Sequence, residues 1–260
     1  MEETVRIKLR HIEASEGVRI LYACEAGSRA WGFESKNSDY DVRFIYSRPV
    51  DWYLTVGRPP RDVLEYPLDS DGLDVSGWDI QKALWLFRKS NPPMLEWLYS
   101  PTVYAERGIC APELRRLTAD YYSPIAAANH YLHMAHANFK EYLRGPEVWL
   151  KKYLYVLRPV LAVKWIERHM NIVPVTFGTL MTGVALDDDV KTAIENLLKA
   201  KMAGEELKRG PAIPVLNYFL EAEINRLDGG ESVLASLGTP GADSIEPLNA
   251  LFRKLVRETI

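Results

Sequence analysis

The chain is poor in cysteine and has no long apolar run and no dominant charge. Cys24 and Cys110 are its only cysteines, too few for a disulfide framework, and they favour a reducing cytoplasm. The longest apolar candidate, residues 149–166, contains four basic residues, so we expect no membrane span and no membrane partner. With 32 basic and 35 acidic residues the net charge is −3, which argues against coating nucleic acid by charge alone.

The overall composition is typical of a globular protein, with 47% apolar residues in a chain of 260. A chain of this length buries roughly 70 to 75% of its unfolded surface, so it needs neither disulfides nor a structural metal. One large or two modest domains are expected.

The apolar pattern changes character near residue 118. Before it, short apolar or alternating runs predict strands, and Asp79 and Asn91 are suited to begin helices; beyond it, apolar residues recur at helical spacing. We therefore expect a domain over 1–118 that mixes strands and helices, and a helical domain over 119–260. The predicted strands are 18–24, 39–47, 62–66 and 73–78, and the later helices are 123–143, 149–169, 187–201, 215–227 and 245–258.

One segment has a pattern suited to chemistry: Gly27-Ser28, ten residues, and then Asp39-x-Asp41 opening a strand. Alternation along a strand places the two carboxylates on one face, roughly 6.5 to 7 Å apart. Carboxylates so placed can hold Mg²⁺, which completes its shell with water and phosphate oxygens. Gly27 permits close backbone approach to a phosphate, and Ser28 can donate its hydroxyl and its amide if a helix begins there.

Each half of this pattern is common, and the same residues could form two turns around a hairpin. The halves occur here in order, with an apolar strand before the glycine and another after the acids. Together they favour an anion cradle beside a cation site.

These residues resemble the signature of the nucleotidyltransferases of the DNA polymerase β superfamily. The amino-acid sequences of residues 27–32, 39–46 and 76–79 are similar to those of the RlaP branch. This branch is predicted to act with RNA-repair enzymes. The resemblance implies an α+β fold: a polymerase-β-like domain, with a small mixed sheet and helices, followed by an all-helical C-terminal domain. It also implies Mg²⁺, or Mn²⁺ in its place, and transfer of a nucleotidyl group from an NTP to an acceptor hydroxyl. An RNA terminus is the leading acceptor, while a small molecule or a protein stays open.

Two acidic residues compete for the role of a third metal-binding and catalytic carboxylate beside Asp39 and Asp41. Asp74 lies inside the apolar stretch 73–78 and matches the position of the third acid in related superfamily members. A structural role as the N-cap of the following helix would be enough to account for Asp79. We favour Asp74, although a one-residue slip in register could exchange the two roles.

Several cations and one phenol are candidates for binding the nucleotide. Arg43 shares a strand face with Asp39 and Asp41, so it either binds phosphate or holds those acids in a salt bridge. On the helix predicted over 149–169, basic and aromatic side chains recur on one polar face, which either binds nucleotide or acceptor or is simply solvated. The candidate nucleotide-binding residues are Gly27, Ser28, Arg43, Lys151, Lys152, Tyr155 and Arg158.

The sequence therefore predicts a metal-dependent nucleotidyltransferase that releases pyrophosphate. The alternative is a catalytically silent regulator that binds nucleotide or RNA on the same fold. Such a regulator would need a broken set of acids, whereas Asp39, Asp41 and a third acid are all present.

Overall fold

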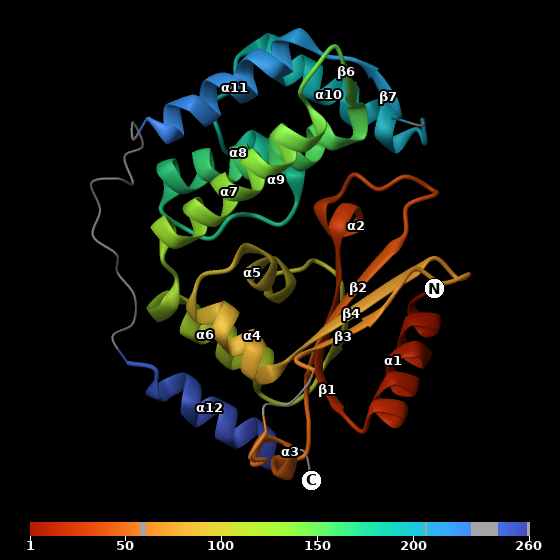
Figure 1. The fold of residues 1–260 in the computed structure, drawn as a ribbon, viewed down its shortest axis with the longest axis vertical. Coiled ribbons are helices and arrows are strands. Elements are labelled where there is room, and N and C mark those ends of the chain that lie inside the picture. The colour runs from red at the N-terminus through yellow and green to blue at the C-terminus, as the bar shows by residue number, and fades with distance from the viewer. Residues whose placement is uncertain (58–60, 206, 230–243, 259–260) are drawn as a thin grey trace. The chain divides into compact units, whose positions relative to one another are not determined.

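The computed structural model describes residues 1–57, 61–205, 207–229 and 244–258. The chain divides into two compact units (Figure 1). The sheet unit comprises Met1–Ala30, Asp39–Tyr122 and Pro240–Ile260, and the helical unit comprises Trp31–Ser38 and Ser123–Thr239. One change of unit, after Tyr122, lies near the boundary expected at 118. The chain also changes unit around the short segment 31–38, and its C-terminal helix belongs to the sheet unit.

The sheet unit is built on a mixed sheet of five strands in the order β3-β4-β2-β1-β5 (Figure 1). The β2–β4 pair is parallel and the other pairs are antiparallel. All four predicted strands are present, with ends within two residues of those expected, and the mixed sheet confirms the predicted fold class. The strands are β1 (Arg19–Ala26), β2 (Tyr40–Ser47), β3 (Val63–Tyr66), β4 (Leu73–Asp79) and β5 (Val103–Glu106).

Helices cover both faces of this sheet. On one face, Val5, Leu9 and Ile12 of α1 (Glu2–Glu16) pack in a buried cluster with strand residues such as Val42 and Phe44. The opposite face is covered by four helices whose apolar residues form the second buried cluster. These helices are α4 (Ile80–Arg88), α5 (Pro92–Leu98), α6 (Cys110–Tyr121) and α12 (Glu246–Arg257), and the short helices α2 (Gly27–Trp31) and α3 (Val50–Tyr53) lie in the connections after β1 and β2.

Side-chain caps begin the first two of these four helices. The carboxylate of Asp79 accepts a hydrogen bond of 2.8 Å from the amide of Gln81, and the side chain of Asn91 accepts one of 3.2 Å from the amide of Met94. Each cap satisfies an amide that has no acceptor within its helix. The predicted role of Asp79 as a helix N-cap is therefore confirmed.

Asp79 is also a buried carboxylate, which makes stability depend on pH. Burial raises its pKa to about 6, although hydrogen bonds from Tyr53 and Gln81 and the charge of Arg48 oppose the rise. The folded state thus holds this proton more tightly than the unfolded state does. The stabilisation is present at pH 4 and is lost as the pH rises through 6.

Asp79→Asn should remove this dependence while keeping the cap. Relative to wild type, the free energy of unfolding of the variant should rise by about 2 to 3 kcal/mol between pH 4 and pH 7, because one pKa unit corresponds to about 1.4 kcal/mol. Urea unfolding at several pH values measures this difference. A difference that stays constant with pH would contradict the assignment.

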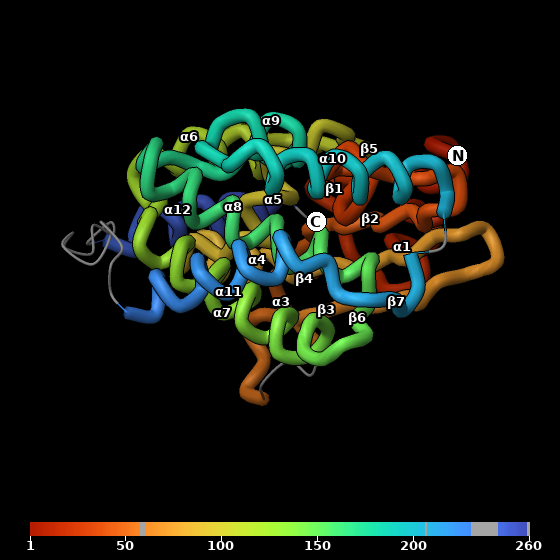
Figure 2. Tube along the Cα trace, turned by 90° about the horizontal axis from the view of Figure 1, so that it is seen from above, coloured from red at the N-terminus to blue at the C-terminus, as the bar shows by residue number. Residues whose placement is uncertain are grey.

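The helical unit contains five α-helices and a two-stranded sheet, β6 with β7, among its described residues; α7 and α8 run side by side (Figure 2). The helix predicted from 149 begins later, at Tyr153, because residues 147–149 pair with β7 and residues 150–152 form a single 3₁₀ turn. The elements are α7 (Pro124–Tyr142), β6 (Glu147–Trp149), η1 (Leu150–Lys152), α8 (Tyr153–His169), α9 (Phe177–Thr182), α10 (Asp188–Met202), β7 (Arg209–Pro211) and α11 (Pro214–Asp228).

The segment 31–38 is packed into the helical unit by ring contacts and by a lysine. The ring of Trp31 meets that of Tyr155 edge-on, with 5.6 Å between ring centres. The ammonium of Lys201 lies 3.5 Å from the hydroxyl of Ser35 and 3.4 Å from that of Ser38. The helical unit therefore holds the residues that directly precede Asp39 in the chain.

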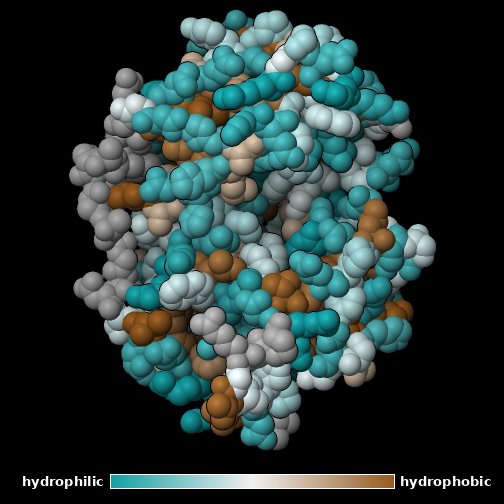
Figure 3. Space-filling model, viewed as in Figure 1, coloured by the Kyte–Doolittle hydropathy of each residue, from teal (hydrophilic) through white to brown (hydrophobic). Residues whose placement is uncertain are grey.

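The surface drawn in Figure 3 is mostly hydrophilic, with apolar residues scattered among polar ones. Within the described ranges, no helix has both the length and the apolar composition that crossing a bilayer requires.

Candidate functional site

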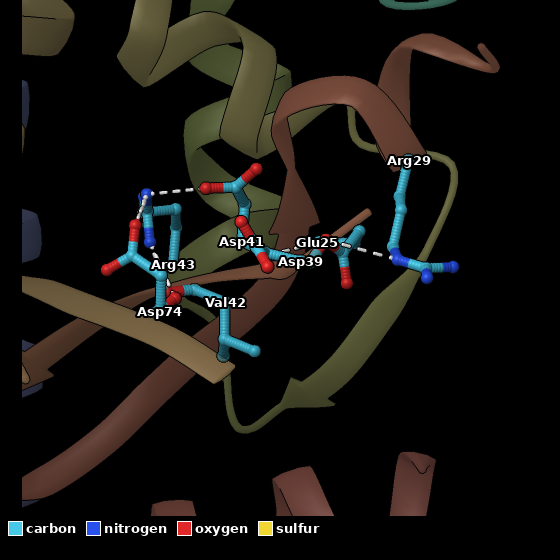
Figure 4. Close-up of polar contacts among 7 residues, drawn as sticks. All are labelled: Glu25, Arg29, Asp39, Asp41, Val42, Arg43 and Asp74. Atoms are coloured by element: carbon cyan, nitrogen blue, oxygen red, sulfur yellow. Dashed lines mark hydrogen bonds and ion pairs between the residues drawn. The ribbon is translucent and has the colours of Figure 1, made fainter. Parts of the chain in front are cut away.

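Two of the predicted acids lie side by side on the parallel strands β2 and β4, where Asp41 is the register partner of Asp74. One guanidinium joins them: Nη2 of Arg43 lies 2.9 Å from Oδ1 of Asp41 and 2.8 Å from Oδ2 of Asp74 (Figure 4). Its Nη1 donates to the carbonyl oxygens of Val42 and Asp74. Of the two roles left open for Arg43, the structure displays the salt bridge, while phosphate binding stays a prediction.

Asp39 is exposed and directly precedes β2. The carbonyl of Asp39 accepts a hydrogen bond of 3.2 Å from Nε of Arg29 (Figure 4). The guanidinium of Arg29 also lies 3.6 Å from the centre of the Tyr40 ring. Arg29 thus ties the end of α2 to the start of β2. The carboxylate of Asp39 is exposed to solvent at the edge where β2 begins.

Gly27 is needed because the carboxylate of Asp41 lies against it. The backbone there has φ +57°, and a Cβ at this position would come within 2.0 Å of Oδ2 of Asp41. L-residues other than glycine avoid this left-handed conformation, and no side-chain atom fits in that space. Ser28 follows in the first turn of α2 and is buried. The structure places the catalytic candidate Asp41 against Gly27, and close approach of a phosphate to Gly27 stays a prediction.

Glu25 is a residue of this site that the sequence reasoning missed. It is 2% exposed, and its Oε1 accepts a hydrogen bond of 2.8 Å from the backbone amide of Asp41. Its Oε2 accepts a hydrogen bond from the hydroxyl of Tyr104. The sequence did contain a signal for Glu25: it is a charged residue at the end of the apolar run 20–24, shortly before the Gly-Ser pair. Glu25 fixes the backbone from which the Asp41 carboxylate projects.

Burial and crowded negative charge make the site unfavourable for unpaired carboxylates. Burial raises the pKa of Asp41, and the charges of Asp74 and Asp39 raise it further, while Arg43 opposes the rise. Burial also raises the pKa of Glu25, against the hydrogen bonds from Tyr104 and from the amide of Asp41. A cation beside these groups stabilises their charged forms.

Glu25→Ala should destabilise the protein by about 2 to 3 kcal/mol, because it leaves the partly buried amide of Asp41 without its acceptor and opens a cavity. Glu25→Gln keeps an acceptor oxygen and should stay within about 1 kcal/mol of wild type. Urea unfolding measures both changes. Hydrogen exchange at the Asp41 amide should quicken in the alanine variant alone, and equal exchange in both variants would contradict this role.

The donor chemistry of this edge fits a hard divalent cation. Two carboxylates at one register position already share a cationic partner, and Asp39 adds a third carboxylate within two residues of Asp41. In the part of the chain that the structure describes, no three side chains among His, Cys, Asp and Glu converge on one point as a complete cation site. Mg²⁺ is usually bound by one or two carboxylates, with water and substrate phosphates filling the other positions.

The structure separates the two competitors for the third acidic position. Asp74 is the second residue of β4 and pairs with Asp41, whereas Asp79 ends that strand as the partner of Tyr46, roughly 16 Å away at about 3.3 Å per residue. The hydroxyl of Tyr53 donates a hydrogen bond of 2.7 Å to Asp79. Geometry brings Asp74, and not Asp79, to the edge with Asp41.

The candidate nucleotide-binding residues 151–158 do not form the single polar face that the sequence indicated. Lys151 is exposed in η1, and Nζ of Lys152 lies between two rings, 4.3 Å from the centre of Tyr142 and 5.0 Å from that of Tyr155. Arg158 is 2% exposed, and its guanidinium lies 4.8 Å from the centre of the Trp31 ring. The helix begins at 153 and packs against segment 31–38, so Arg158 is buried.

Family comparison bears on this arrangement. Residues 1–254 match the model of the RlaP family, described as the RNA repair pathway DNA polymerase beta family. The chain belongs to the RlaP family. The match extends through the helical unit, which the Gly-Ser and Asp-x-Asp motif alone did not cover.

The chain is also similar to a curated protein and to a solved structure. The chain is 45% identical over 258 residues to the uncharacterized protein YcgL of Bacillus subtilis (strain 168), a match that covers 99% of this chain and 97% of the relative. A nucleotidyltransferase-like protein from Exiguobacterium sibiricum 255-15 is 15% identical, with a TM-score of 0.32 over 89% of this chain and 77% of that one.

Proposed function

We propose that this RlaP-family chain transfers a nucleoside monophosphate from an NTP to an acceptor hydroxyl, with release of pyrophosphate. An RNA terminus is the proposed acceptor. The observation that carries the proposal is the pairing of Asp41 with Asp74 at one register position of two parallel strands, next to Gly27 and two residues after Asp39.

Asp39, Asp41 and Asp74 would hold Mg²⁺, or Mn²⁺ in its place. When bound, the ion neutralises charge on the phosphate oxygens and lowers the pKa of the attacking hydroxyl.

The chain's own residues supply position. Glu25 accepts a hydrogen bond from the backbone amide of Asp41, and Arg43 forms ion pairs with both Asp41 and Asp74. Gly27 leaves room for the Asp41 carboxylate. Ser28 donates its hydroxyl and its first-turn amide to the phosphates.

The transfer itself is an in-line displacement at the α-phosphorus. A bond forms between the acceptor oxygen and the α-phosphorus while the bond to the bridging oxygen of the β-phosphate breaks. Asp74, whose side chain is 40% exposed, takes up the proton of the acceptor hydroxyl, and the electron pair of the broken bond leaves with pyrophosphate.

The roles proposed for the helical unit follow from its cations. Lys151 and Lys152 present ammonium groups that can bind the triphosphate or the acceptor, and Tyr155 adds a ring beside Lys152. The guanidinium of Arg158 packs against the ring of Trp31. Its contribution to nucleotide binding is therefore to keep in place the segment that precedes Asp39.

Asp74→Asn and Asp79→Asn form a matched pair of carboxylate replacements on one strand. Asp74→Asn should reduce transfer about a hundredfold or more while the NTP still binds, because it removes a carboxylate from the reacting edge. Asp79→Asn should leave transfer within about twofold of wild type, since the asparagine still caps α4. Steady-state rates at saturating NTP measure both, and the reverse pattern would move the role to Asp79.

The proposal is tested by incubating the protein with each NTP labelled at the α-phosphate, Mg²⁺ and RNA with free or blocked termini. Label should appear on RNA with free termini, with one pyrophosphate released per nucleotide transferred. Label on a protein or small-molecule fraction instead would contradict the RNA acceptor. Saturable NTP binding without transfer to any acceptor would contradict the enzyme and leave the silent regulator.

A further inference from the structure

In the helical unit, Trp149 of β6 and Tyr142, the last residue of α7, each have a cation over their ring. Trp149 is 44% exposed, and the guanidinium of Arg209 lies 5.8 Å from the centre of its ring. Nζ of Lys152 lies 4.3 Å from the centre of the Tyr142 ring. The transfer chemistry at the carboxylates gives Trp149, Arg209 and Tyr142 no role.

Backbone pairing places Trp149 and Arg209 side by side. Trp149 and Arg209 are register partners in the β6–β7 pair, which both ribbon and tube views show as neighbouring segments (Figures 1 and 2). The pairing continues past the strand ends, since the amide of Leu150 donates to the carbonyl of Lys208 over 3.1 Å. Residues 149 and 152 are three apart, so their Cα atoms are separated by at most about 10 Å. Trp149 of one cation–aromatic pair and Lys152 of the other therefore lie close together along the chain.

The same stretch concentrates positive charge. Residues 142–152 and 207–211 contain five basic side chains and a single acidic one, Glu147. Among the described residues, no carboxylate forms an ion pair with Arg144, Lys151, Lys152 or Arg209. The chain as a whole has a net charge of −3, so this excess is a local property. The β6–β7 surface consists of Tyr142, Arg144, Trp149, Lys151, Lys152, Lys208 and Arg209.

We propose that the β6–β7 surface binds single-stranded RNA, an inference that rests on the proposed function. Unpaired bases stack on Trp149 and Tyr142, and the phosphates between them meet the surrounding cations. An acidic peptide would satisfy the cations but would bring no flat rings for the two aromatic faces. This assigns Lys151 and Lys152 to the acceptor, one of the two roles left open for them.

The test is binding of a short fluorescent oligoribonucleotide of mixed sequence, measured by anisotropy without NTP and without metal. Binding under these conditions is independent of catalysis. The variants are Trp149→Ala, Trp149→Phe and Arg209→Ala. The matched control is Trp85→Ala on α4, because Trp85 is 50% exposed and has Nζ of Lys89 4.4 Å from a ring centre.

Trp149→Ala should weaken binding about tenfold, and Trp149→Phe should restore most of the loss because phenylalanine keeps an aromatic face. Arg209→Ala should weaken binding and make its dependence on the logarithm of salt concentration shallower by about 0.7, the value of one phosphate contact on a single strand. Trp85→Ala should bind as wild type does. Duplex RNA of the same sequence should bind more weakly, since its bases are already stacked.

Three results would overturn the proposal: wild type that fails to bind the oligonucleotide saturably, equal losses in Trp149→Ala and Trp85→Ala, or displacement of the oligonucleotide by polyglutamate with no effect of Trp149→Ala. The last would identify an acidic protein partner. Transfer that persists without binding through Trp149 would contradict this surface alone. Binding through Trp149 in a protein that transfers nothing would contradict the proposed function alone.

Discussion

Asp41→Asn should lower nucleotidyl transfer about a thousandfold or more, because charge stabilisation at the reacting phosphates is worth several kcal/mol and each 1.4 kcal/mol is tenfold in rate. Asp39→Asn should have an effect of the same order, since its carboxylate lies on the same strand edge. Rates with α-labelled NTP at saturating Mg²⁺ measure both losses. Transfer above about a tenth of the wild-type rate in either variant would contradict the metal assignment.

Loss of structure does not account for this expected effect. Burial and two neighbouring acids raise the pKa of Asp41, so the neutral asparagine relieves unfavourable charge. Arg43 keeps its ion pair with Asp74 and its bonds to two carbonyls. Without metal, the melting temperature of Asp41→Asn should be unchanged or higher, and a marked fall would show that the carboxylate is mainly structural.

Gly27→Ala should abolish most of the transfer by moving the Asp41 carboxylate. The added Cβ would come within 2.0 Å of Oδ2 and 2.7 Å of Cγ of Asp41, so the side chain or the strand end must shift. A displacement of about 1 Å at a reacting group costs on the order of a hundredfold in rate. The left-handed backbone adds about 1 to 2 kcal/mol of destabilisation.

Gly17→Ala is the matched control for Gly27→Ala. Gly17 has nearly the same backbone conformation, φ +62°, and nothing lies within 4 Å of a Cβ built on it. It should lose only the stability that the left-handed backbone costs, about 1 to 2 kcal/mol, and keep full transfer at temperatures where both proteins are folded. Equal rates in the two variants would show that the collision with Asp41 has no bearing on catalysis.

Local patterns predicted most of the sheet and the later helices. Strand alternation located β2 to within one residue, because its buried face packs on α1. The helix α1 was not predicted, although Val5, Leu9 and Ile12 recur at helical spacing, because charged residues surround this short apolar stripe. The strand β5 was missed because its four residues show little alternation between buried and exposed positions.

What sequence could not supply depends on contacts between distant segments. The packing of residues 31–38 against α8 and α10 is set by rings and a lysine more than a hundred residues away, so the buried position of Arg158 was not predictable from its own helix. Likewise, the short distance between Gly27 and Asp41 follows from strand pairing. Glu25 was recognisable only as a charge in an apolar run.

Metal binding at the carboxylate edge tests the central claim most directly. Titration with Mn²⁺, followed by electron paramagnetic resonance in the presence of a non-hydrolysable NTP, reports binding without turnover. Wild type and Asp79→Asn should bind Mn²⁺ with similar affinity, whereas Asp41→Asn should bind it about a hundredfold more weakly or not at all. Equal Mn²⁺ affinity in wild type and Asp41→Asn would contradict the account.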